Sequence, residues 1–230
     1  MRLARHFTAF AALLLAAGTA AAQSRDGEWV SYREAYRAMV VFEKYGGPKN
    51  LIQNQLQVAP KDRGASADGL QLALSGKATQ LTLPLDATGR ARLPLLKAAY
   101  DENAVLVLSR AGGQFLLRTR VSIVVRPDGV YDGAELRAGC EQALGYARYA
   151  DRSLGGKQCA AVRFVFPKKA EASVRVRKPH AAEAALPLAE GIAFEGDTEA
   201  GFPTVTYRLV AERVQVLTNQ PPLAIVPLFE

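Results

Sequence analysis

Hydrophobic residues recur at helical spacing near the start of the chain. Ser31 and Glu34 have the spacing of a capping box, in which each side chain satisfies a free amide of the first turn. Aromatic and apolar residues then follow at intervals of three and four, namely Tyr32, Tyr36, Met39 and Phe42. Because Gly46-Gly47-Pro48 interrupts this pattern, we predict a capped helix that ends before residue 46 and buries its aromatic stripe.

The spacing then changes to every second residue, which is typical of half-buried strands. The alternating leucines are Leu70, Leu72 and Leu74, followed by Leu81, Leu83 and Leu85. Residues 86–89 have turn chemistry, and a short strand at 91–95 after them predicts a hairpin. Pro84 and Pro94 lack the N–H that a strand ladder uses, so we expect this hairpin at a sheet edge or with bulges.

Two later stretches predict the middle of the sheet. Residues 104–108 are apolar on both faces, which favours a central strand. The longest alternation runs from Phe115 to Val125 and places Arg118 and Arg120 opposite its apolar face. We expect that second face to lie in solvent.

A second helix is predicted from Asp132, an acidic cap followed by Glu135. Cys140 lies on its apolar face, while Gly139 and Gly145 indicate close packing against a neighbour. Further strands are expected at 162–166, 174–177, 205–209, 214–216 and 223–229, with part of 180–202 as a long loop. These elements predict one α+β domain over residues 23–230, a mainly antiparallel sheet packed by two capped helices with one disulfide.

Residues 1–22 have the organisation of a secretory signal peptide. Arg2 and Arg5 precede the apolar run 7–17, and three alanines precede a cleavage site before Gln23. We therefore expect export to a bacterial periplasm, with secretion beyond the cell as the alternative. No later stretch approaches the roughly 18 apolar residues of a membrane span, so none is expected in the mature chain.

Charge narrows the class of partner. The formal net charge of the 230 residues is +7, and it falls to +5 when the two leader arginines are removed. This modest charge argues against nucleic acid as a partner and favours weak attraction to anionic glycans, lipids or peptidoglycan.

The only two cysteines are Cys140 and Cys159. In an exported protein such a pair predicts a disulfide, here closing a loop of about 20 residues. A redox role is disfavoured because the adjacent C-x-x-C arrangement is missing.

Motifs for catalysis are scarce. His180 is the only histidine after the leader, which excludes zinc sites with two imidazoles, and we predict no metal and no cofactor. The motifs G-x-S-x-G, S-x-x-K and the phosphate loop are all missing. A carboxylate pair for a small periplasmic hydrolase remains an alternative, from Asp101, Glu102, Asp128, Asp132 and Glu135. The last three of these also leave a calcium site open, although turn and cap roles explain them more simply.

Basic residues provide the leading candidate for a binding surface. Arg175, Arg177 and Lys178 follow valines on a predicted strand and share an exposed face, and Arg118 with Arg120 is the second candidate. A solvated edge strand protected by its charge is the simpler interpretation. We predict a non-catalytic binding module for an anionic envelope component or a periplasmic protein. A structural role, with residues 223–229 pairing onto a partner strand, is a further alternative.

Overall fold

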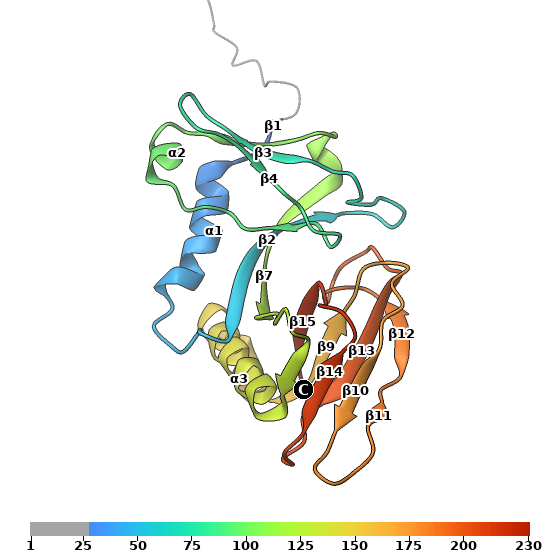
Figure 1. Cartoon of the computed structure of the whole chain (residues 1–230). Helices are drawn as coiled ribbons and strands as arrows, with labels where there is room; N and C mark the ends of the chain where they lie inside the picture. Colours follow the sequence, from blue (N-terminus) through green and yellow to red (C-terminus); the bar gives the residue numbers. More distant parts are fainter. Residues whose placement is uncertain (1–27) are drawn as a thin grey trace, which may run out of the picture.

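The computed structural model describes residues 28–230, so the predicted leader lies outside the described residues. The described chain has mixed α/β content, with three helices, three antiparallel sheets and one disulfide (Figure 1). This confirms the predicted fold class. The helices are α1 (Tyr32–Lys44), α2 (Lys97–Asp101) and α3 (Gly133–Ala150).

The strands form one seven-stranded and two four-stranded sheets. The first four-stranded sheet contains, in spatial order, β1 (Glu28–Ser31), β6 (Val105–Leu108), β3 (Leu72–Ser75) and β4 (Gln80–Leu83). The second contains β11 (Ala184–Ala185), β10 (Val174–Arg177), β14 (Gln215–Thr218) and β8 (Val130–Asp132). The seven-stranded sheet contains β12 (Leu188–Gly191), β13 (Phe202–Arg208), β9 (Cys159–Val165), β15 (Ala224–Phe229), β7 (Phe115–Ile123), β2 (Ile52–Pro60) and β5 (Arg90–Ala91).

Two hydrophobic cores share the long strands β2 and β7. These strands have nine residues each and pair from Ile52 opposite Ile123 to Pro60 opposite Phe115. One end, with Leu56 and Phe115, packs into the N-terminal core, and the other end, with Ile52 and Ile123, packs into the C-terminal core. The seven-stranded sheet therefore connects the N-terminal and C-terminal parts of the fold (Figure 1).

Helix α1 begins and ends where its pattern predicts, and Tyr32, Met39 and Phe42 are buried. The predicted capping box is wrong, because the Ser31 side chain makes no cap hydrogen bond. Strand β1 runs directly into the helix, and the Tyr32 N–H donates to the carbonyl of Ala104 at 2.9 Å. Pairing of the chain beside β6 thus satisfies one of the free amides of the first turn, although a capping side chain would serve the amide of the second or third helical residue.

The hairpin predicted around residues 86–89 is also wrong. The turn forms, but β4 before it pairs with β3, and β5 after it pairs with β2 in another sheet. The turn is closed locally by Asp86, whose carboxylate accepts from the N–H groups of Thr88 and Arg90 at 2.9 and 3.0 Å. A self-contained turn leaves the strands on either side free to pair elsewhere.

Helix α3 confirms the second capped helix. The Asp132 carboxylate accepts from the Ala134 N–H at 2.7 Å, and Cys140 forms the predicted disulfide with Cys159 in β9. A Cβ at Gly139 would lie 3.1 Å from the side chain of Ile123, so this glycine allows the close approach of α3 to the sheet.

Several elements were not predicted, including the five-residue helix α2 and the short strands β1 and β8. The short strands β11 and β12 were not predicted either, and they lie within the stretch 180–202, part of which was expected to be loop. No helix among residues 28–230 is long and apolar enough to cross a bilayer.

Candidate functional site

The predicted basic residues of β10 are exposed but paired with carboxylates. Arg177 and Arg175 contact Glu183 at 2.7 and 3.7 Å, and Lys178 contacts Glu212 at 2.7 Å. The side chains of Arg177 and Lys178 keep about half of their surface exposed, at 51% and 50%. These residues therefore form a mixed-charge surface with accessible cations.

A cavity of about 390 Å³ opens beside this strand, and we call it the basic cavity. Arg177 and Lys178 line it from the end of β10, and Arg213 lines it from the segment before β14. Its remaining lining residues are Asp132, Pro179, Val214 and Gln215. Arg175 does not line the cavity, although it lies two residues before Arg177 and therefore on the same face of β10.

Sequence reasoning missed Arg213. It precedes β14, and the register that brings it to the cavity places Gln215 opposite Arg177. Only cross-strand pairing reveals this neighbourhood, because Arg177 and Arg213 are 36 positions apart in the sequence.

A second cavity of about 530 Å³ adjoins the basic cavity and shares Lys178 with it. Its walls are mostly apolar and come from Val176, Ala182, Ala184, Leu186, Thr206, Tyr207 and Val210, with Arg208 as its other cation. The buried Tyr207 hydroxyl has no hydrogen-bond partner within the described chain, and burial raises its pKa. This phenol is therefore neutral near pH 7.

Arg118 and Arg120 do not form a solvent-exposed surface, so that part of the sequence interpretation is wrong. The segment before β13 folds over them, and Asp197 contacts Arg120 at 2.5 Å and Arg118 at 3.7 Å. The Arg120 side chain is only 17% exposed, and Arg118 also donates to the carbonyl of Gly196. The apparent polar face of β7 is covered by an ordered loop that strand alternation cannot reveal.

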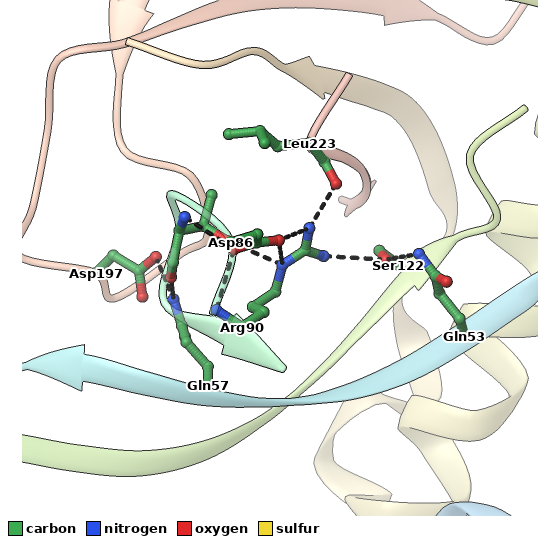
Figure 2. Close-up of polar contacts among 8 residues, drawn as sticks. Gln53, Gln57, Asp86, Arg90, Ser122, Asp197 and Leu223 are labelled. Carbon is green, nitrogen blue, oxygen red and sulfur yellow. Dashed lines mark hydrogen bonds and ion pairs between the residues drawn. The ribbon is translucent and has the colours of Figure 1, made fainter. Parts of the chain in front are cut away.

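Beside this loop lies a buried polar cluster centred on Arg90 (Figure 2). The guanidinium donates to the carboxylate of Asp86, to the hydroxyl of Ser122 and to the carbonyl of Leu223. In the adjoining part of Figure 2, the Gln57 amide donates to Asp197 at 3.2 Å. Every guanidinium nitrogen of Arg90 has a partner, so this cluster connects the turn at 86–89, β7 and the entry to β15 rather than presenting a free cation.

The candidate hydrolase carboxylates serve structural contacts. Glu102 accepts from the N–H groups of Ala78 and Thr79 at 2.8 and 3.2 Å, which lowers its pKa. The contact with Arg126 lowers the pKa of Asp128. A carboxyl group that acts as a general acid near neutral pH needs a raised pKa, so these lowered pKa values argue against that role.

The other candidate carboxylates are engaged in the same way. Asp101 pairs with Lys97, Glu135 contacts Arg126 at 3.2 Å, and Asp132 caps α3. No cluster of three or more metal-ligating side chains occurs within residues 28–230.

The C-terminal strand lies inside the seven-stranded sheet. Residues Ala224–Phe229 pair with β9, and on the other edge β15 pairs with β7 at Ile225 alone. The edge of β15 that faces β9 is therefore already occupied. Pairing with a strand of a partner protein would have to use the edge that faces β7.

Comparison of the chain with protein-family models, with curated proteins and with solved structures gave no match.

Proposed function

We propose that the protein is an exported binding protein, without catalytic activity, that takes an anionic ligand of the cell envelope into the basic cavity. The observation that carries this proposal is the convergence of Arg177, Lys178 and Arg213 on one cavity from two separate segments of the chain. Guanidinium and ammonium groups together donate to carboxylate, sulfate and phosphate oxygens. The lowered pKa of Glu102 and Asp128 argues against either carboxyl as a general acid.

The existing ion pairs do not prevent such binding. Glu183 is paired with Arg177 and Glu212 with Lys178 on exposed surfaces, where an ion pair contributes about 0–1 kcal/mol. An anionic ligand that contacts several cations together therefore displaces these carboxylates at small cost. Arg213 forms no ion pair with the described part of the chain, so it is available without any exchange.

The proposal is tested by reversing charge inside the cavity. We expect Arg213→Glu and Lys178→Glu to elute from a heparin matrix at clearly lower salt than the wild type, because attraction becomes repulsion within the cavity. Thermal unfolding of each variant should stay close to wild type, since surface changes of this kind cost about 0.5 kcal/mol or less.

Arg152→Glu is the matched control. It makes the same change in net charge at an exposed residue beyond the far end of α3. If Arg152→Glu weakens retention as much as Arg213→Glu does, retention reflects total charge and the basic cavity is not the site.

A further inference from the structure

Strands β15 and β7 are neighbours in the sheet but pair at a single position, Ile225 opposite Ile123. Beyond that point β15 continues in register with β9 as far as Leu228, where the register shifts before Phe229, and β7 continues in register with β2. The two strands are therefore each paired on their outer edges while the ladder between them stops.

The sequence explains why it stops. In an antiparallel ladder that pairs Ile225 with Ile123, Pro227 lies opposite Val121. Residues two apart in a strand direct their main-chain N–H and C=O groups to the same side, so Pro227, like Ile225, faces β7. The next pair of hydrogen bonds between the strands would need an N–H at this position, and proline has none.

The interruption leaves main-chain groups of β7 without a partner strand. The Val124 N–H donates to Leu51, so the even-numbered residues of β7 bond to β2 and the odd-numbered ones point toward β15. Within residues 28–230, the N–H and C=O groups of Thr119 and Val121 on this side have no strand partner.

A cavity of about 240 Å³ occupies this position, and we call it the slit. Thr119 and Val121 line it from β7, and Val226, Pro227 and Phe229 line it from β15. The remaining lining residues are Arg120 from β7, Ala143, Tyr146 and Ala147 from α3, and Phe194 and Glu195 from the loop that covers Arg120.

We propose that the slit binds an extended, largely apolar peptide segment of a partner protein, which pairs with the free edge of β7. This inference is independent of the basic cavity. A row of alternating strand N–H and C=O groups is matched by another extended backbone, which supplies acceptors and donors at the same spacing.

The lining specifies the side chains of that segment. On the α3 side two of the three residues are alanines, and the opposite side presents the ring of Phe194. Arg120 also lines the slit, but it is bonded to Asp197 and to Gln57, at 2.5 and 2.6 Å, so it has little capacity to bind an acidic side chain. Small apolar side chains fit this environment better than charged ones.

The first measurement is amide hydrogen exchange of the free protein. We expect the N–H groups of Thr119 and Val121 to exchange faster than those of Arg120 and Ser122, which pair with β2. Equal protection of all four in a monomer would mean that the ladder is closed and would overturn the proposal. A dimer that protects Val121 without any peptide would assign the slit to a second copy and would also overturn it.

The second measurement uses a displayed library of random heptapeptides. We expect enriched peptides with alternating apolar residues, whose binding slows exchange at Val121. Methylation of alternate backbone nitrogens in a synthetic copy should weaken binding at least about tenfold, because it removes the donors that pair with β7. The proposal would be overturned if peptides bind equally well whether their odd-numbered or their even-numbered backbone nitrogens are methylated. It would also be overturned if bound peptides leave the exchange rate of the Val121 N–H unchanged.

A variant provides an independent check. Pro227→Val restores the missing N–H and should let β15 pair with Val121, so peptide binding should fall at least about tenfold. Pro221→Val changes an exposed proline outside the slit and should bind as the wild type does. The methylated peptide tests wild-type protein, so the proposal remains open to refutation even if Pro227→Val does not fold.

Discussion

At the scale of single residues, Arg90 is 2% exposed and its three guanidinium nitrogens all have acceptors. The ring of Phe194 lies 5.1 Å from its guanidinium carbon. Such a charge is tolerated in the interior because its partners replace the water that it loses.

Removing this side chain should therefore destabilise the fold. We expect Arg90→Met to lower the free energy of unfolding by about 3 kcal/mol, because it leaves Asp86 without its cation and the Leu223 carbonyl without its donor. Urea denaturation measures this loss. Arg92→Met, at an exposed arginine two residues away, should change the value by about 0.5 kcal/mol or less, and equal losses in both variants would contradict the assigned role.

The arginines of β7 show that alternation along a strand does not reveal which distant segments cover its polar face. Arg118 and Arg120 alternate with apolar residues as solvent-exposed side chains do, and that prediction is wrong because Asp197, far along the chain, covers them. Arg90 and Arg213 were not singled out at all. Their roles depend on Leu223 and Arg177 respectively, which are distant in sequence.

At the scale of elements, local chemistry predicts helices better than it predicts strand partners. Asp132 caps α3 as expected, since a carboxylate needs only the amide two residues ahead. The turn at 86–89 was also recognised, but the partners of β4 and β5 were not. Partner choice depends on non-local pairing, which no local pattern encodes.

The disulfide joins two elements, the helix α3 and the strand β9. Because it closes a loop with a sequence separation of 19, it should stabilise the fold by about 3 kcal/mol through the unfolded state. We expect Cys140→Ala/Cys159→Ala to melt roughly 6–12 °C below the oxidised wild type. Calorimetry of both proteins checks this, and coincident melting temperatures would show that α3 is held by packing alone.

At the scale of the whole molecule, the C-terminal strand belongs to the interior. Ala224, Ile225 and Val226 are buried, and β15 lies between β9 and β7. Deletion of residues 223–230 should therefore give an insoluble or non-cooperatively unfolding product, since it removes the partner of β9 and the carbonyl that binds Arg90.

Near-ultraviolet circular dichroism and solubility report this outcome. Glu230→Gln is the control, because its side chain is 71% exposed and its loss should leave the fold intact. A truncated chain that stays soluble and unfolds cooperatively would show that β15 is dispensable for the core.

The sequence by itself determined the α+β class, the two long helices, the disulfide and the basic character of β10. These features depend on spacing within about 20 residues, on caps and turns, and on there being only two cysteines. The tertiary structure alone decided that Arg118 and Arg120 are covered, that Arg213 joins Arg177, and that Pro227 interrupts the ladder beside β7. The physical reason is that each of these depends on strand register and loop placement between segments far apart in the chain, where packing rather than local propensity selects the arrangement.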